Sequence, residues 1–95
     1  MTSLETLTHA DFAPVESQPF VLEQTTLMLE SAQLLSQMRA GASRAPFSLL
    51  FSGPPGLRLQ QGIHTMSHAS LGTLAIFITQ VGDGPNGSKF EAIFT

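Results

Sequence analysis

Three histidines are the residues of this chain best suited to hold a metal ion. His64 and His68 lie four positions apart in a segment with the alternation of a strand. That spacing puts them on one face but about 13 Å apart, at about 3.3 Å per residue. One ion cannot be bound by both at the ~2.0–2.1 Å of a zinc–imidazole bond; His9 would have to pair with one of them, and no carboxylate lies near His64 or His68 in sequence. We therefore expect no metal site and interpret the histidines as packing residues with hydrogen-bonded rings near the rim of a sheet.

Catalytic arrangements are equally hard to find. The chain has no cysteine, which excludes thiolate nucleophiles and thiolate metal ligands. No G-x-S-x-G turn is present, and Ser67 would point to the strand face opposite His68. The only aspartates are Asp11 and Asp83. The glycines of residues 82–87 resemble the start of a phosphate loop, but a strand follows where a helix would be needed. We expect no catalytic residue and no cofactor, so that the protein is not an enzyme.

The composition indicates one domain with few charges. The 95 residues are 42% hydrophobic but only 12% charged, with a net charge of −3. The usual charged share is about 25%, and a subunit whose surface is covered needs less solvated charge than a monomer does. Four scattered basic residues form no patch for nucleic acid, namely Arg39, Arg44, Arg58 and Lys89.

The expected location of the protein is left open. No apolar run reaches the ~18 residues that suggest a membrane span. The N-terminus has neither the basic nor the apolar part of a secretory signal. We therefore expect a protein that is cytoplasmic, or released and assembled outside the cell without a cleaved signal.

The elements that must position these side chains begin after a tail, residues 1–7. Thr8 and Asp11 have the spacing of a capping box, which predicts a short helix over His9–Ala13 that ends at Pro14. Gln18–Glu23 is predicted to be a strand with Pro19 at its edge. Thr25–Gln37 fits helical spacing as well, but its Thr-Thr start and the short link before it favour a second strand, bulged or bent near Ser31. Met38–Ala45 is predicted to be a long loop.

Four more strands are predicted in the rest of the chain. They cover Phe47–Ser52, Gly62–His68, Thr73–Val81 and Lys89–Thr95, and the last pairs most simply with Thr73–Val81. Turns are predicted at Ser52–Gly56, Ala69–Gly72 and Gly82–Ser88. The pattern indicates an all-β domain over residues 1–95, a small antiparallel β-sandwich or barrel of six to seven strands with a short N-terminal helix.

Strand alternation also predicts which residues face outward. The inward set would be Phe47, Leu49, Phe51, Leu74, Ile76, Ile78, Phe90, Ala92 and Phe94. The outward set then contains three large apolar residues, Leu50, Phe77 and Ile93. A sheet that is apolar on both faces is covered either by its own chain or by another protein. Residues 18–37 could fold over this face, so both possibilities stay open.

Five sequence runs resemble a small uncharacterised bacterial domain family. They are FSLLFSGP (Phe47–Pro54), L-x-Q-G-x-H-x-M-x-H (Leu59–His68), L-G-x-L-x-I-F (Leu71–Phe77), FEAIF (Phe90–Phe94) and L-T-x-A-D-F (Leu7–Phe12). The resemblance covers nearly the whole chain. Its residues are core and turn positions, so it transfers no catalytic or binding site.

The resemblance also implies a setting for the protein. Genes of the family are often found beside genes for phage-tail-collar-like proteins, which implies a tail-fibre-like or appendage assembly. His64 stands where the family leads us to expect an aromatic residue such as tyrosine, in keeping with a packing role.

We therefore expect a structural or interaction subunit of a larger bacterial assembly, a homo-oligomer or filament with a possible phage-tail-collar-like protein as partner. The candidate interface is Leu50, Phe77 and Ile93. The alternative is a small-ligand-binding β module, which a lined cavity of several hundred Å³ would favour and a fully packed barrel would not.

Overall fold

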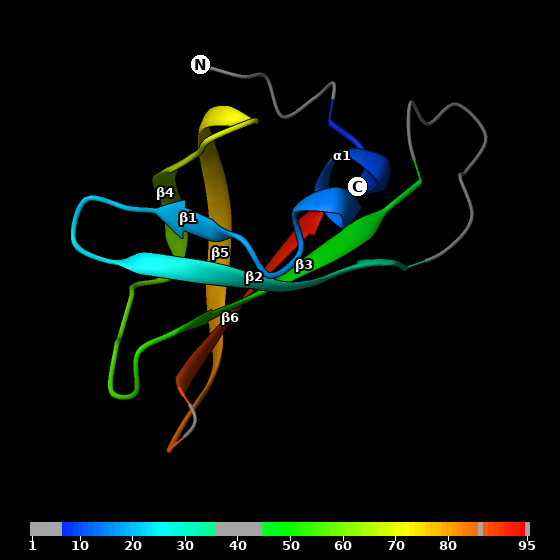
Figure 1. Cartoon of the computed structure of the whole chain (residues 1–95). Coiled ribbons are helices and arrows are strands. Elements are labelled where there is room, and N and C mark those ends of the chain that lie inside the picture. The colour runs from blue at the N-terminus through cyan, green and yellow to red at the C-terminus, as the bar shows by residue number, and fades with distance from the viewer. Residues whose placement is uncertain (1–6, 36–44, 86, 95) are drawn as a thin grey trace.

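Six antiparallel strands and two short helical segments make up the computed structural model, which describes residues 7–35, 45–85 and 87–94 (Figure 1). The elements are α1 (His9–Phe12), the 3-10 helix η2 (Ala13–Val15), β1 (Pro19–Val21), β2 (Thr26–Leu34), β3 (Phe47–Gly53), β4 (Gly62–His68), β5 (Gly72–Gly84) and β6 (Gly87–Phe94). This confirms the predicted all-β class and short N-terminal helix.

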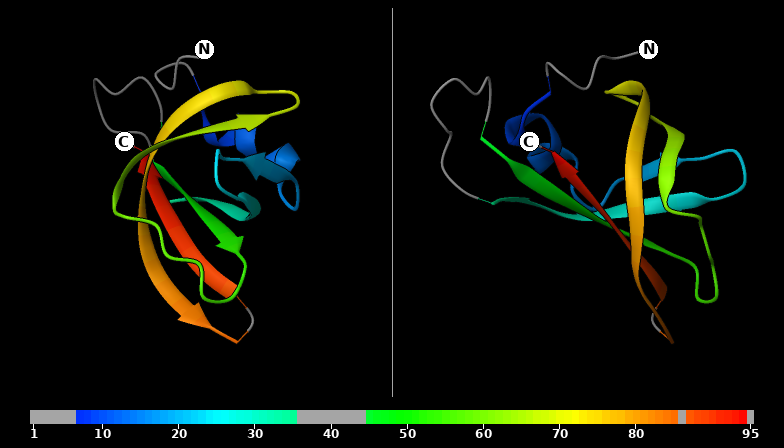
Figure 2. Two further views of the ribbon diagram at one scale, coloured as in Figure 1. Left: turned by 90° about the vertical axis from the view of Figure 1, so that its left-hand side faces the viewer. Right: turned by 180° about the vertical axis from the view of Figure 1, so that it is seen from behind.

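The strands form a closed barrel in the order β1-β2-β3-β6-β5-β4. The last strand pairs with β5, as predicted, and it also pairs with β3 from Ser88 to Phe94. The first half of β5 pairs with β4 and its second half with β6. Figure 2 shows the result: β5 and β6 meet at their shared turn and separate toward the other end. Strand β5 therefore joins the two sides of the barrel.

The N-terminal helix is held by its predicted cap. The backbone N–H of Thr8 donates to Asp11 Oδ2 at 2.8 Å, which is one half of a capping box. The expected end at Pro14 is wrong, because the chain continues as η2 through Pro14 to Val15. A proline in the first turn of a helical segment loses no hydrogen bond, since that N–H would be unpaired anyway.

Removing this cap tests how far so short a helix depends on it. We expect Asp11→Ala to lower the free energy of unfolding by about 1 kcal/mol, because it removes the acceptor of the Thr8 N–H. Asp11→Asn keeps an oxygen at the same place and should lose less. Urea denaturation of the three proteins measures this, and equal stabilities would contradict the capping role.

Predicted strand limits differ from the observed limits mainly at the ends. The predicted bulge in the second strand is confirmed by a shift in register between Leu29 and Ser31. The predicted loop Met38–Ala45 lies outside the described residues except for Ala45. The first two residues of the predicted turn Ser52–Gly56 belong to β3, and the turn itself runs from Pro54 to Leu57, whose N–H donates to Pro54 O at 3.1 Å.

The prediction of a turn over Gly82–Ser88 is wrong at both ends. Strand β5 continues to Gly84 and β6 begins at Gly87, and these two glycines form the last pair of the hairpin. Glycine has a low strand propensity, but pairing across the hairpin, and with β3 beyond it, outweighs that preference. The turn is therefore tighter than the glycine-rich segment indicates.

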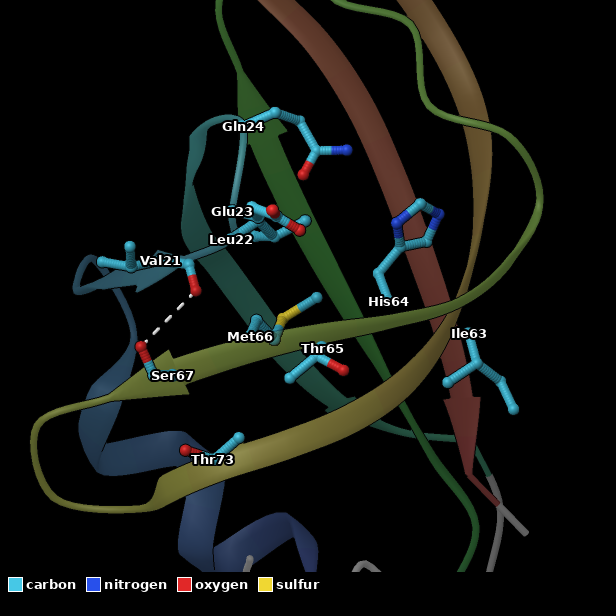
Figure 3. Close-up of a pocket in the computed structure, with 10 residues that line it drawn as sticks. All are labelled: Val21, Leu22, Glu23, Gln24, Ile63, His64, Thr65, Met66, Ser67 and Thr73. Atoms are coloured by element: carbon cyan, nitrogen blue, oxygen red, sulfur yellow. Dashed lines mark hydrogen bonds between the residues drawn. The ribbon is translucent and has the colours of Figure 1, made fainter.

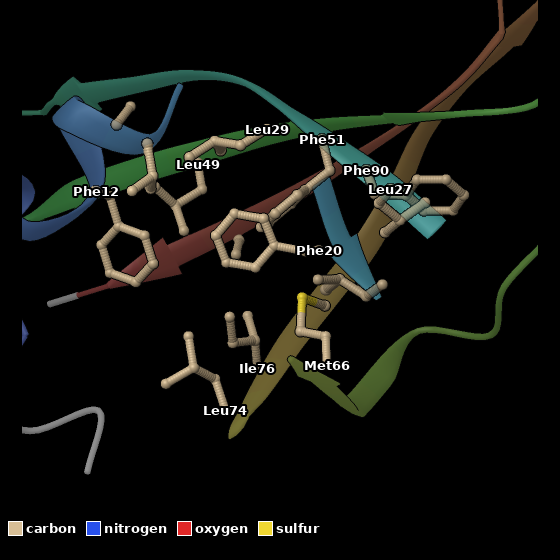
Figure 4. Close-up of a cluster of buried hydrophobic side chains, with 14 of the residues drawn as sticks. Phe12, Phe20, Leu27, Leu29, Leu49, Phe51, Met66, Leu74, Ile76 and Phe90 are labelled. Carbon is tan, nitrogen blue, oxygen red and sulfur yellow. The ribbon is translucent and has the colours of Figure 1, made fainter. Parts of the chain in front are cut away.

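The barrel interior is filled by apolar side chains, and every residue predicted to face inward is buried (Figure 4). Helix α1 adds Phe12, whose ring lies 5.7 Å from those of Phe47 and Phe94 at one end of the barrel. Leu7 is also part of this core, so the tail predicted over residues 1–7 is wrong for its last residue. It is buried because the capped helix brings the preceding residue onto the core.

Candidate functional site

The three residues predicted as an interface lie on the outer surface of the barrel. Phe77 is 51% exposed and Ile93 is 52% exposed, while Leu50 is partly buried. Burial of such side chains in an interface would be favourable, since fully burying one contributes about 1.5–3 kcal/mol. Their use as an interface stays a prediction, but their position on the outer face agrees with the strand alternation.

Strand register brings these residues near one another. Ile93 on β6 is opposite Ser48 on β3, so Leu50 is its diagonal neighbour, within reach of a long side chain. At the end away from the shared turn, the ladder between β5 and β6 stops at the pair of Thr79 on β5 and Glu91 on β6. Phe77 and Ile93 each lie two residues past this pair on their own strands. The two residues therefore flank the point at which β5 and β6 separate.

A fourth residue belongs to this surface and was missed in the sequence. Ile63 on β4 is paired directly with Phe77 on β5, and at 71% it has the highest exposure among the exposed large apolar residues. Alternation places Ile63 on the face opposite His64 and Met66. The alternation of β4 could have placed Ile63 on the outer face from the sequence alone. Only the register of β4 on β5 shows that Ile63 lies opposite Phe77. We call Leu50, Ile63, Phe77 and Ile93 the outer apolar strip.

The surroundings of the outer apolar strip carry little charge. Its nearest cross-strand neighbours include Ser48 and Thr79, which are uncharged, and one carboxylate, Glu91. Lys89 on the same strand is already paired with Glu30, with 2.6 Å between Nζ and Oε1. A partner can therefore approach the strip with few charges to desolvate.

The described part of residues 18–37 does not cover this surface. Strands β1 and β2 are members of the barrel itself, on its other side from β5, and their inward residues Phe20, Leu27 and Leu29 join the common core. The possibility that this segment folds over the outer face is therefore wrong for residues 18–35. Closing the barrel buries more apolar surface than a second layer of so few strands could.

His68 has the packing role expected of it. The side chain is buried, with its ring centroid 4.8 Å from that of Phe20. Nδ1 accepts hydrogen bonds from the N–H groups of Ser70 at 3.0 Å and Leu71 at 3.2 Å. Nε2 lies 2.7 Å from Gln18 Oε1 and therefore carries the proton. The ring thus holds the β4–β5 turn and the start of β1 together.

The other two histidines are also engaged by the protein's own carbonyl groups. His9 Nε2 donates to Ala32 O at 2.9 Å and His64 Nε2 donates to Gln60 O at 2.7 Å. Among residues 7–35, 45–85 and 87–94, no three metal-binding side chains are grouped around a common point. The expectation that no metal is bound stays a prediction.

The aspartates are used to hold turns. Asp11 caps α1, and Asp83 forms an ion pair with Arg58 at 3.3 Å and accepts from the N–H of Gly56 at 3.2 Å. Ser67 faces away from His68, as predicted, with its hydroxyl 3.5 Å from Val21 O. In this arrangement neither aspartate is hydrogen-bonded to a histidine.

A pocket of about 540 Å³ lies beside β4, not in the barrel interior (Figure 3). Its walls are the tip of the β1–β2 hairpin and the neighbouring side of β4. The lining residues are Val21, Leu22, Glu23, Gln24, Ile63, His64, Thr65, Met66, Ser67 and Thr73. Leu22 and Met66 are buried and supply apolar surface, while Gln24 and His64 stand on opposite sides of the opening. The lining is therefore mixed, with the apolar side chains of Val21 and Ile63 beside hydroxyl, amide, carboxylate and imidazole groups.

Comparison with known proteins gives one family match. A family model described as a domain of unknown function matches residues 7–94. No curated protein and no solved structure matches the chain. Neither helical segment in the described part of the chain has the length and hydropathy that a membrane crossing needs.

Proposed function

This chain belongs to the DUF6916 family of domains of unknown function, and from that premise we propose that it is a structural or interaction subunit that self-associates through its outer apolar strip. The observation that carries this proposal is the direct pairing of Ile63 with Phe77, both largely exposed, beside Ile93. Exposed large apolar side chains that lie next to one another on a surface are typical of a protein-binding site.

Simple energetics support a second copy as the partner. Fully burying an exposed apolar side chain contributes roughly 1.5–3 kcal/mol, of which each partly exposed side chain of the strip supplies a part, against association costs of at least several kcal/mol. Because each copy brings the same strip, the contribution is counted twice. The low charge around the strip also lets two identical surfaces meet without strong like-charge repulsion.

The proposal extends to a filament. A contact between the strips of two copies closes as a dimer, so a filament needs a second contact between two different surfaces, which continues from copy to copy unless its rotation closes a ring. The backbone edge of β4, next to Ile63, could contribute hydrogen bonds to such a contact. The family resemblance supports a tail-fibre-like or appendage assembly, with a phage-tail-collar-like protein as a further partner.

Replacing Phe77 by aspartate tests this proposal. We expect Phe77→Asp to weaken self-association at least about tenfold, because it puts a carboxylate in the middle of the strip and removes its largest side chain. The fold should persist, since the side chain is half exposed. Sedimentation velocity at tens of micromolar measures the association, and circular dichroism checks the fold.

Val81→Asp is the matched control. Val81 lies on the same strand with a similar exposure of 53%, but at the β5 bulge and outside the strip. The Val81→Asp variant should self-associate as strongly as the unaltered protein. If the unaltered chain sediments as a 10.1 kDa monomer in the absence of any partner, the proposal is contradicted. Equal effects of Phe77→Asp and Val81→Asp on self-association would also contradict it.

A second candidate function is a ligand-binding β module. The observation that favours it is the pocket beside β4, whose volume of about 540 Å³ is within the range of ligand sites. The barrel interior is filled with side chains, so the ligand would lie at this side of the barrel and not at its centre.

A further inference from the structure

The barrel is closed between β1 and β4 by very little backbone pairing. Among the described residues, the only pair between these strands is Val21 with Ser67. After Val21 the chain turns away into the β1–β2 hairpin, where the N–H of Leu22 donates to Thr25 O at 2.8 Å. Residues 62–66 of β4 are therefore paired with β5 on one side and with no strand of the described structure on the other.

The lining of the pocket coincides with this open edge of β4. All residues from Ile63 to Ser67 contribute to it, although successive side chains of a strand point to opposite faces. The surface that consecutive residues share is the edge of the strand, with its backbone N–H and C=O groups. On the opposite wall, Leu22, Glu23 and Gln24 come from the hairpin tip (Figure 3).

We propose that this pocket binds an extended peptide segment of a partner protein, which adds to the barrel as a strand along β4. Unpaired N–H and C=O groups at a strand edge are the template for this mode of recognition. The inference rests on the ligand-binding candidate function; its site is the edge of β4, and it shares Ile63 with the outer apolar strip.

The dimensions fit a short segment. The open part of β4 runs from Gly62 to Met66, and five residues at about 3.3 Å each give a length of about 16 Å. A peptide of four to six residues in extended form would match that length. Alternate residues of the peptide would then lie beside Val21 and Ile63, the exposed apolar side chains of the lining.

The charges define the peptide further. Glu23 is the one carboxylate among the lining residues, it is exposed, and no arginine or lysine lines the pocket. The other polar groups of the lining are the amide of Gln24, the hydroxyls of Thr65, Ser67 and Thr73, and the ring of His64, whose Nε2 proton is already donated to Gln60 O. The segment that fits best has apolar residues at alternate positions and a lysine or arginine between them.

The test uses the full chain labelled with ¹⁵N and followed by NMR. The probes are blocked peptides of the form acetyl-Thr-Xaa-Lys-Xaa-Thr-amide, with valine, isoleucine, leucine or phenylalanine at each Xaa. We expect at least one to bind with a Kd below about 1 mM, with shift changes at Ile63–Ser67 and Leu22–Gln24. Glu23→Gln should raise that Kd about threefold, whereas Glu91→Gln, on the outer face of β6, should leave it unchanged.

Peptides N-methylated at two consecutive central amides separate strand addition from simple occupation of the pocket. They keep every side chain but lose two N–H groups, one of which faces β4 in either register. The added methyl group also keeps the peptide backbone from approaching β4, so we expect no binding. Equal binding of these peptides would overturn the proposal in favour of an ordinary ligand pocket. Absence of binding by every peptide at about 1 mM, or shift changes at Leu50 and Ile93 without changes at Thr65–Ser67 and Leu22–Gln24, would also overturn it.

The same titration of the Phe77→Asp variant separates this inference from self-association. If that variant is monomeric and still binds peptide, both proposals stand. If it is monomeric and the unaltered and variant chains both fail to bind, only the peptide site is lost.

Discussion

Replacing Gly87 by alanine will lower the free energy of unfolding by about 3 kcal/mol or more. A Cβ at this position would lie 2.5 Å from the carbonyl oxygen of Gly53, and Gly87 has a φ of 122°, which side chains rarely permit. The contact cannot relax easily, because Gly53 is in β3 and pairs with Ser88 on β6. Urea denaturation followed by circular dichroism measures the change.

Gly84→Ala is the control for this substitution. Gly84 is the partner of Gly87 in the same hairpin, but a Cβ there would meet no atom within 4 Å. We expect a change below about 1 kcal/mol. Equal losses from the two substitutions would mean that the hairpin as a whole, and not the close approach of β3 and β6 at Gly87, requires glycine.

The second large effect is expected from His68→Ala, which should lower the free energy of unfolding by about 3–5 kcal/mol. The substitution leaves a cavity beside Phe20 and removes the acceptor of two backbone N–H groups, those of Ser70 and Leu71. It also removes the partner of Gln18 Oε1. Thermal and urea denaturation give the difference.

His64→Ala provides a matched control on the same strand and the same face. That ring is less buried and has one hydrogen bond, to Gln60 O. We expect a loss of about 1 kcal/mol or less. Similar effects of the two alanine substitutions would contradict the role assigned to His68.

His68 also lies beside the proposed peptide site. Its contacts with Gln18 and Phe20 join β4 to the start of β1, next to the single backbone pair of Val21 and Ser67. They therefore hold together the end of the β1–β4 junction at which the proposed peptide site begins. Side-chain contacts here replace the ladder that a longer β1 would have formed.

Much of the fold follows from local patterns in the sequence. Alternation in Phe47–Phe51 and Leu74–Ile78 assigned the inward residues correctly, because successive side chains of any strand point to opposite faces. The cap of α1 and the bulge near Ser31 also depend on neighbouring residues. For the same reason Leu50, Phe77 and Ile93 could be placed on the outer face without knowledge of the strand order.

The candidate sites depend on contacts between distant parts of the chain, and only the tertiary structure decided them. Ile63 meets Phe77 because of the register of β4 on β5, and β6 lies between β3 and β5 because it pairs with both. The pocket exists because β1 leaves β4 after one pair. Alternation has the same period in every register that differs by two residues, so a local pattern cannot choose among them. The choice is made when the whole core packs, and it is this packing that leaves the edge of β4 open.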